Sequence, residues 1–159
     1  MATAKILGVP AVSYKKSIAA FTNLEHRLEL VGQIHGVKYF DNSFSTTPES
    51  TILDLQSFRE PLILIAGGAD KGASFKALAQ TIKNRVKFLV LLRGQATPRI
   101  KKDLLKIKFP RQKLGETDSM GEAVNLARQA ADGGDIILLS TACASFGLFK
   151  NYKERGGEG

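Results

Sequence analysis

Short apolar runs bounded by polar or glycine residues recur along this chain, and they constrain its fold more than any other feature. Residues 62–66, 86–92 and 135–139 each have the length of a strand that is buried on both faces. Amphipathic helical patterns lie between them, as over residues 75–82, where apolar residues recur at i, i+3, i+4 and i+7. Strands that alternate with helices from residue 37 onward predict a mostly parallel sheet.

Residues 27–41 follow a different period, because apolar and polar residues alternate there with a repeat of two. The pair His35-Gly36 interrupts this alternation and fits the turn of a β-hairpin, which makes His35 a surface residue of that turn. The expected fold class is therefore α/β: a Rossmann-like, mostly parallel sheet with helices on both faces, preceded by a β-hairpin.

The start of the first long helix can be read in two ways. Thr47 fits an N-cap with Pro48 at the first helical position, whereas Thr46 with Glu49 fits a capping box one residue earlier. Either cap explains one threonine but leaves the rest of the polar segment 41–47 without a structural role.

Other local signals are weaker. Residues 1–22 carry two short helical patterns, and Ser13 fits the cap of the second. A weak edge strand is expected at 112–114. Ser119 and Glu122 are spaced as a capping box and predict the start of another helix.

Composition limits the classes of function. The chain has 159 residues, 43% of them hydrophobic, which is enough for one domain with a core. Its single cysteine, Cys143, permits no internal disulfide and fits a reducing cytoplasm. No apolar stretch is long enough to cross a bilayer, and the N-terminus lacks a signal-peptide pattern. We therefore expect a cytoplasmic protein without membrane insertion.

The net charge of +8 makes anionic partners worth considering. The basic residues between 99 and 113 alternate with apolar ones, however, and fit the solvent-facing side of an amphipathic helix. Neither a known binding module nor an aromatic platform accompanies them, so nucleic acid is not an expected partner.

Three polar segments, residues 41–47, 67–72 and 140–145, each follow an expected strand. In a parallel sheet these segments meet at one edge, where ligands of open α/β sheets bind. Small residues and glycines leave backbone amides free for an anion, and Lys71 adds a cation. Taken alone, residues 140–145 fit a tight packing corner equally well. Cys143 is interpreted as structural, since neither histidine can be placed beside it.

The same segments carry a resemblance to a known family. The chain resembles the C-terminal domain of the Mur ligases over residues 24–156, and its last motif is typical of the members that add D-glutamate. The resemblance implies that residues 1–25 are the tail of a preceding ATP-binding domain and a linker, that 26–156 form the domain, and that 157–159 are a frayed end. The segments that carry it are His26-Arg27-Leu28-Glu29, Asp41 to Glu49, Gly67 to Gly72 and Ser140 to Gly156.

By this resemblance the full protein joins D-glutamate to UDP-N-acetylmuramoyl-L-alanine, through an acyl phosphate made with ATP, in peptidoglycan synthesis. ATP and Mg²⁺ would be held mainly by a central domain absent from this chain. The chain alone is therefore expected to be inactive and to carry neither a catalytic residue nor a metal ligand. The full protein is expected to be a monomer. The implied D-glutamate contacts are Thr46, Lys71, Ser145 and Phe149, and the implied ATP contacts are Arg27, Asn42 and His26.

The segment Asp41 to Glu49 departs from the family pattern, and so does the last motif, with Thr141 in place of the usual proline and Gly147 in place of the usual aspartate. The chain reads Asp41-Asn42-Ser43-Phe44 where the family often reads Asn-Asp-Ser-Lys, so an amide replaces an acid and a phenyl ring replaces a cation. From the residues alone, His26 fits a linker residue as well as a ligand contact. A stand-alone module that binds an anionic metabolite or nucleotide without catalysis is the alternative function.

Overall fold

A single six-stranded sheet forms the centre of the fold. The computed structural model describes residues 2–20, 24–145 and 149–157. The strand order is β1-β2-β6-β3-β4-β5, with β1 antiparallel to β2 and the other neighbours parallel. The strands are β1 Glu29–Ile34, β2 Val37–Asp41, β3 Leu62–Gly67, β4 Val86–Leu92, β5 Leu114–Thr117 and β6 Ile136–Leu139. The predicted Rossmann-like α/β sheet with a leading hairpin is confirmed.

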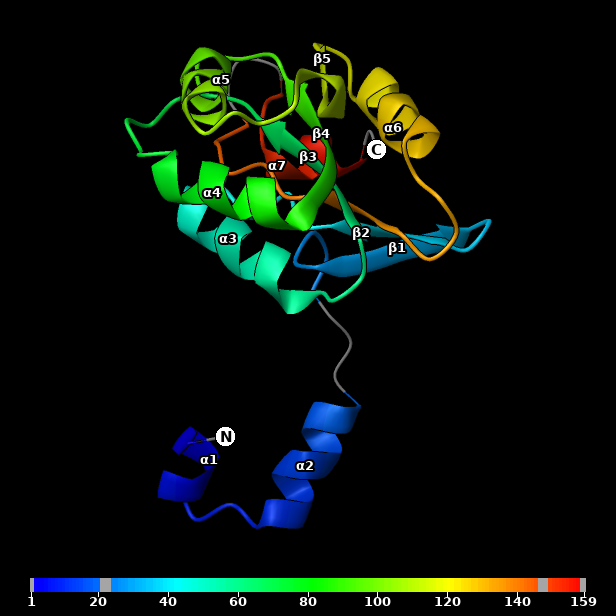
Figure 1. Ribbon diagram of the computed structural model, residues 1–159. Helices are drawn as coiled ribbons and strands as arrows, with labels where there is room; N and C mark the ends of the chain where they lie inside the picture. Colours follow the sequence, from blue (N-terminus) through cyan, green and yellow to red (C-terminus); the bar gives the residue numbers. More distant parts are fainter. Residues whose placement is uncertain (1, 21–23, 146–148, 158–159) are drawn as a thin grey trace.

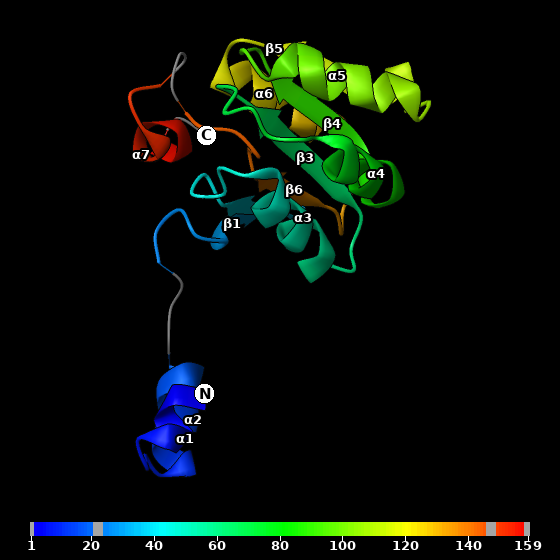
Figure 2. The same ribbon diagram turned by 90° about the vertical axis from the view of Figure 1, so that its left-hand side faces the viewer.

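Helices cover both faces of this sheet. The helices of the described residues are α1 Ala2–Ile6, α2 Ala11–Ala19, α3 Pro48–Ser57, α4 Lys76–Arg85, α5 Thr97–Lys106, α6 Met120–Gln129 and α7 Tyr152–Gly157. Figures 1 and 2 show α3, α4 and α5 on one face and α6 on the other. Successive strand residues point to opposite faces. In β3, Leu64 therefore packs with α3, α4 and α5, whereas Ile63 and Ile65 pack with α6.

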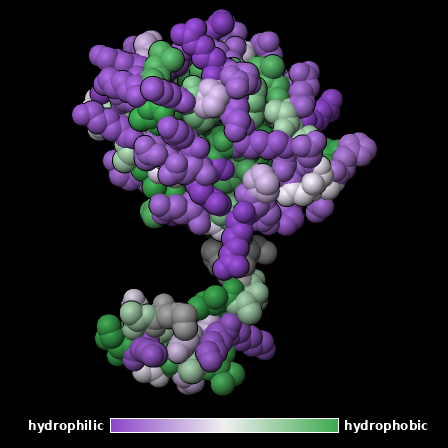
Figure 3. Space-filling view, viewed as in Figure 1, coloured by the Kyte–Doolittle hydropathy of each residue, from purple (hydrophilic) through white to green (hydrophobic). Residues whose placement is uncertain are grey.

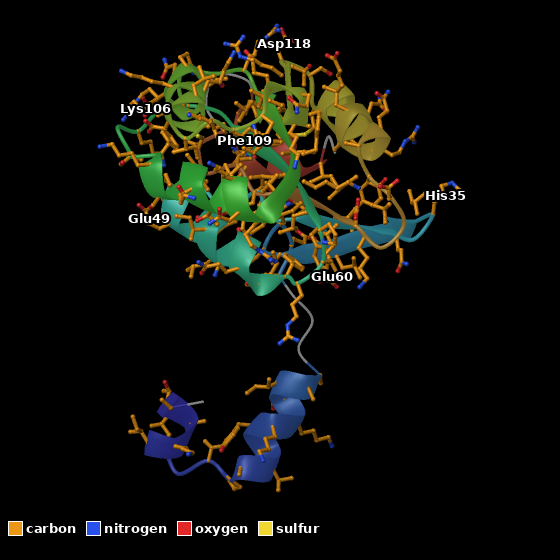
Figure 4. The ribbon with its side chains drawn as sticks, in the orientation of Figure 1. His35, Glu49, Glu60, Lys106, Phe109 and Asp118 are labelled. Carbon is orange, nitrogen blue, oxygen red and sulfur yellow. The ribbon has the colours of Figure 1, made fainter. Side chains whose placement is uncertain are left out.

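The hairpin turn has the backbone geometry that the sequence predicts. His35 and Gly36 both have positive φ, at 50° and 81°, as the central residues of a type I′ turn do. Ile34 pairs with Val37 across this turn. His35 lies at the exposed tip of the hairpin (Figure 4), so its interpretation as a surface turn residue is confirmed.

The helix caps differ in detail from the expected ones. Thr47 is the N-cap of α3 with Pro48 at its start, and the capping box is completed by the hydroxyl of Ser50 rather than by Glu49. At α6, the hydroxyl of Ser119 accepts the amide of Glu122 as predicted. The Glu122 carboxylate instead accepts a hydrogen bond from the side chain of Thr117, so only half of that capping box forms.

The edge strand lies further along the chain than predicted. Residues 111–113 form a turn of 3-10 helix (η1, Arg111–Lys113), and β5 begins only at Leu114. Pairing with β4 sets this register, since Leu114 lies opposite Leu89 and Thr117 opposite Leu92. The prediction of a strand at 112–114 was therefore wrong by two residues.

The N-terminal helices bury none of their described residues. α2 begins at Ala11, and Ser13 lies inside its first turn, so the prediction of Ser13 as the cap was wrong. Ile6 and Val12 are 84% and 78% exposed, and Figure 3 shows apolar side chains at the surface of these two helices. Within the described residues, no helix is long and apolar enough to span a membrane.

Candidate functional site

The three polar segments meet at the carboxyl edge of the sheet. Residues 41–47, 67–72 and 140–145 follow β2, β3 and β6, which are neighbours in the strand order. We call them the three-loop edge. The amide of Ala69 donates to the carbonyl of Ala144 over 2.9 Å, and the amide of Ala142 donates to the carbonyl of Ser45 over 3.2 Å. Direct hydrogen bonds thus join all three loops, which confirms the predicted convergence.

Gly67 and Gly68, at the start of loop 67–72, are required by close packing of backbones. A Cβ on Gly68 would lie 2.3 Å from the carbonyl oxygen of Ala144, and one on Gly67 would lie 2.3 Å from that of Leu92. Both glycines also have positive φ, at 118° for Gly67 and 140° for Gly68. Gly67 and Gly68 therefore allow the contact between this loop and its neighbours.

A buried polar network lies beneath the loops. The carboxylate of Asp54, on α3, accepts hydrogen bonds from Asn42 Nδ2 at 2.8 Å and from Ser140 Oγ at 2.7 Å. Thr51, one helical turn earlier, contacts the hydroxyls of Ser45 and Ser140. Sequence reasoning missed Asp54 and Thr51, although polar residues on the buried face of an amphipathic helix are a usable signal.

This network determines what Asn42 can do. Its side chain is 7% exposed and points inward, with its amide engaged by Asp54. This bond uses one of the two Nδ2 hydrogens, and burial limits the access of a ligand to the rest of the amide. The ATP role of Asn42 stays a prediction.

Lys71 is the exposed cation of the edge. In the described part of the chain it forms no ion pair, whereas its neighbour Asp70 pairs with Arg99 at 2.6 Å. The hydrogen bond from Arg99 is the main reason that the pKa of Asp70 lies below its usual value, with the Gly72 amide adding to the effect. The adjacent carboxylate is therefore neutralised by Arg99, and the Lys71 charge faces solvent.

The other residues predicted to contact D-glutamate lie on the neighbouring loops. Ser145 is 6% exposed, and its carbonyl accepts the amide of Phe149 over 3.1 Å. Phe149 packs against the apolar cluster on the α6 face, and Thr46 is half-buried beside Ser45. The structure thus places Thr46, Ser145 and Lys71 on three joined loops. Residues 146–148 of the last motif lie outside the described part.

Cys143 lies on the same loop as Ser145 but has low reactivity. It is buried, and burial raises the pKa of its thiol to about 12, against an opposing effect of the Arg155 charge. A thiol with this pKa stays protonated at neutral pH and is a poor nucleophile. The interpretation of Cys143 as structural is consistent with this environment.

His26 anchors the start of the domain. Its Nδ1 lies 2.6 Å from Oδ2 of Asp41, its amide donates to the carboxylate of Glu29, and its carbonyl accepts the amide of Phe44. Ligand atoms of His26, Glu29 and Asp41 lie within 4.8 Å of one another. Both oxygens of Asp41 are already engaged, because Oδ1 accepts the amide of Ser43. Hydrogen bonds within the group therefore account for this cluster.

Arg27 is exposed next to His26, and Phe44 positions it. The guanidinium carbon lies 4.4 Å from the centroid of the Phe44 ring, as in a cation–π contact, and the ring edge of Tyr152 lies against Phe44 with centroids 5.2 Å apart. The phenyl ring at position 44 therefore has a structural explanation: it supports an arginine predicted to face ATP.

Arg155 is the most deeply buried charge near the loops, at 1% exposure. Its NH1 and NH2 groups donate to the carbonyls of Cys143 and Ser43. Burial is the largest effect on its pKa, which falls to about 10, so the side chain is still charged at neutral pH. Sequence reasoning missed Arg155, because nothing in a polar stretch near the end of the chain distinguishes a buried arginine from exposed ones.

The basic residues of α5 lie on the solvent side of an amphipathic helix, and one of them, Arg99, pairs with Asp70 of the edge. Lys101 pairs with Glu116 at 2.6 Å and Lys106 with Asp103 at 3.2 Å, whereas Ile100 is buried. This arrangement supports the interpretation of the basic cluster as a solvated helix face.

The mostly parallel sheet with converging polar loops defines an α/β domain whose candidate ligand site lies at the carboxyl ends of its strands. Residues 26–143 match the family described as "Mur ligase, glutamate ligase domain", and the chain belongs to this family.

Two curated relatives give the likeness in more detail, and both are named UDP-N-acetylmuramoylalanine--D-glutamate ligase. That of Caldanaerobacter subterraneus subsp. tengcongensis is 39% identical over 153 residues, which is 96% of this chain and 34% of the relative. That of Roseiflexus sp. (strain RS-1) is 43% identical over 155 residues, which is 98% of this chain and 33% of the relative. The chain thus spans about a third of the length of the curated relatives it matches.

Solved structures share the fold at low identity. The MurF ligase from Thermotoga maritima in complex with ADP matches with a TM-score of 0.65 and 14% identity, over 99% of this chain and 35% of that one. The bifunctional folylpolyglutamate synthase/dihydrofolate synthase from Yersinia pestis CO92 matches with a TM-score of 0.61 and 12% identity, over 84% of this chain and 32% of that one.

Proposed function

We propose that this chain is the amino-acid-binding domain of an ATP-dependent ligase that adds D-glutamate to UDP-N-acetylmuramoyl-L-alanine. In that reaction ATP phosphorylates the substrate carboxylate to an acyl phosphate and leaves as ADP. The amine of D-glutamate then attacks the acyl carbon, and phosphate leaves from the tetrahedral intermediate. The proposal rests on family membership and on relatives that carry this activity in their names.

The chemistry of the three-loop edge supports D-glutamate as the ligand. D-glutamate carries two carboxylates, which call for a cation and for hydroxyl or amide donors. Lys71 supplies an exposed ammonium, and Thr46 and Ser145 supply hydroxyls on loops joined to its own. We assign these three residues, with Phe149 as an apolar wall, to D-glutamate binding.

ATP and Mg²⁺ belong to this proposal as substrate and cofactor held mainly outside this chain. The solved relatives include complexes with ADP and with AMPPNP and Mn. In this chain the exposed guanidinium of Arg27 fits a phosphate contact, since it has no carboxylate partner among the described residues and is supported by Phe44. We assign Arg27 to ATP, with His26 and Asn42 as neighbours of that contact.

The role of this domain is to align the amine of D-glutamate with the acyl phosphate and to close over ATP, since positioning is the main contribution that such a domain can make to catalysis. Residues 1–25 act in this proposal as the end of the preceding domain and a linker, 26–156 as the binding domain and 157–159 as its end. A free, buried Cys143 fits a reducing cytoplasm, and we propose a cytoplasmic, monomeric protein.

The exposed ammonium of Lys71 beside the joined loops carries the proposal, and a chimaeric ligase tests it. Residues 26–157 replace the matching third of the Roseiflexus relative, and phosphate release is followed as D-glutamate is varied. Lys71→Ala should raise the KM for D-glutamate by about 10- to 100-fold, the worth of one charged hydrogen bond. Lys113→Ala, an exposed lysine of η1 just before β5 at the opposite end of the sheet, should leave it unchanged. An unaltered KM in Lys71→Ala would refute the assignment.

Calorimetry on the 159-residue chain addresses the alternative of a stand-alone binding module. Weak or undetectable binding of D-glutamate and ATP fits a domain that needs the rest of a ligase. Tight binding of either ligand to the isolated chain would favour the module.

A further inference from the structure

The short helix α7 is held on the three-loop edge by one buried side chain. Arg155 extends from this helix into the interior, where it is 1% exposed. Its NH2 donates to the carbonyl of Ser43 over 2.6 Å, and its NH1 donates to the carbonyl of Cys143 over 3.1 Å. Those carbonyls lie on different loops, so one planar group spans the distance between them.

Both carbonyls are close in sequence to residues assigned to D-glutamate. Ser43 precedes Thr46 by three residues, and Cys143 precedes Ser145 by two. Ala142, the neighbour of Cys143, has a φ of 57°, a conformation that alanine adopts only when its surroundings impose it. The hydrogen bond from Arg155 to Cys143 lies next to this strained residue.

A buried arginine is a costly way to fill this space. Desolvation disfavours the charge and lowers the pKa of Arg155, and Cys143 and then Asp41 oppose this effect. Asp41 already accepts hydrogen bonds from its own neighbours. Among the described residues, Arg155 Nε and Ser43 Oγ are the buried side-chain polar atoms without a hydrogen-bond partner. An apolar side chain would avoid these costs, but it could not fix the separation of two carbonyl groups.

The residue after Arg155 shows how closely α7 approaches. A Cβ on Gly156 would lie 2.4 Å from both Asp41 Oδ2 and His26 Nδ1, and 2.7 Å from Ser43 Oγ. Only glycine permits this contact. In α7, Gly157 is the matched opposite case, because a Cβ there would meet no atom within 4 Å.

We infer that Arg155 is a positioning residue for the amino-acid site: its guanidinium sets the spacing between loop 41–47 and loop 140–145. The inference rests on the proposed function in that these loops are taken to hold D-glutamate. Arg155 acts through the backbone of the loops, while Thr46 and Ser145 make the contact with the substrate.

Hydrogen exchange on the 159-residue chain tests the structural half without any activity. In Arg155→Met, the amides of Ala142 and Ala69, which join the loops, should exchange about tenfold faster or more, as expected for local opening. The amide of Ile136, which donates to Pro61 at the other end of β6, should be unaffected. Lys153→Met, an exposed change on the same helix, is the matched control. Unchanged protection at Ala142 would overturn the inference.

Kinetics of the chimaeric ligase test the functional half. Arg155→Met should raise the KM for D-glutamate by about tenfold, with a smaller change in kcat, since the loss falls on binding. Arg155→Lys, which keeps the charge but not the planar fork, should restore part of the affinity. If Lys71→Ala raises this KM and Arg155→Met does not, the inference is wrong while the proposed function stands. If neither does, both are wrong.

A substitution at Gly156 tests the same inference if the Arg155 variants fail to fold. Gly156→Ala keeps Arg155 but should displace α7, so it should raise the KM for D-glutamate and speed exchange at Ala142 as Arg155→Met does. Gly157→Ala should do neither. Equal behaviour of the two glycine variants would overturn the close docking of α7 on which the inference depends.

Discussion

The amide of Ala69 donates a 2.9 Å hydrogen bond to the carbonyl of Ala144, and the two residues form an isolated antiparallel bridge. This bridge joins the loop that carries Lys71 to the loop that carries Ser145. Because both loops extend from parallel neighbouring strands, the bridge turns two separate strand ends into one surface. The D-glutamate site proposed for this domain depends on that connection.

The close approach at Gly68 makes the bridge sensitive to a single methyl group. Gly68→Ala should destabilise the domain by about 2–4 kcal/mol, because the new Cβ collides with the Ala144 carbonyl and alanine is strained at this φ. The measurement is the free energy of unfolding in urea. Gly121→Ala, on the exposed side of α6 with no atom nearer than 3.9 Å, should be neutral or stabilising by up to about 1 kcal/mol. Equal destabilisation of both variants would contradict the role of the close approach.

Asp54 organises the polar network below the loops. Asp54→Ala removes an acceptor from Asn42 and Ser140 and should cost about 2–3 kcal/mol of unfolding free energy, since buried donors lose their partner. The exposed Glu49 on the same helix is the control and points to solvent in Figure 4. Glu49→Ala should cost at most about 1 kcal/mol, from the helix dipole. If Asp54→Ala lowers the free energy of unfolding no more than Glu49→Ala does, the network adds little stability.

The pair of Lys101 and Glu116 predicts a pH dependence of stability. The hydrogen bond from Lys101 is the largest cause that holds the pKa of Glu116 below its usual value. A carboxyl whose pKa is lower in the folded state stabilises that state above its unfolded pKa, and this stability is lost as the pH falls through the folded pKa. Lys101→Met should therefore make the acid-side fall of the melting temperature shallower. Lys102→Met, the exposed neighbour, should leave the profile unchanged.

The buried thiol of Cys143 can be followed directly, because the chain has one cysteine. With a folded-state pKa of about 12, its thiolate fraction at pH 8 is far below that of a free cysteine. Alkylation by iodoacetamide should be slower by about a thousandfold or more in the folded chain than in the chain unfolded by guanidinium. Similar rates in the two states would mean that the thiol is accessible and would reopen its role in chemistry.

Much of the fold could be predicted from local patterns. The segments predicted at 62–66, 86–92 and 135–139 form β3, β4 and β6, because apolar runs of that length are buried on both faces. The turn at His35-Gly36 could be predicted because both residues tolerate positive φ. The start of β5 could not, since its register depends on pairing with β4, where Leu114 lies opposite Leu89.

The candidate site could be predicted only in part from local sequence patterns. Convergence of the three loops follows from parallel strands, so it could be predicted once the sheet was expected. Asp54, Arg155 and the Phe44 support for Arg27 could not, because each depends on a contact between segments distant in the chain. The direction in which Asn42 points is of the same kind, since Asp54 is its partner.

The sequence by itself determined the order of strands and helices, the hairpin and the placement of polar residues after strands, because hydrophobic periodicity and turn chemistry are local. Only the tertiary structure decided that Gly67 and Gly68 serve backbone packing and that Arg155 is buried between two loops. Burial and hydrogen-bond partners are properties of the folded chain. Arg155 would be a surface charge if nothing packed over it, and it is a buried side chain that joins two loops because other segments cover it.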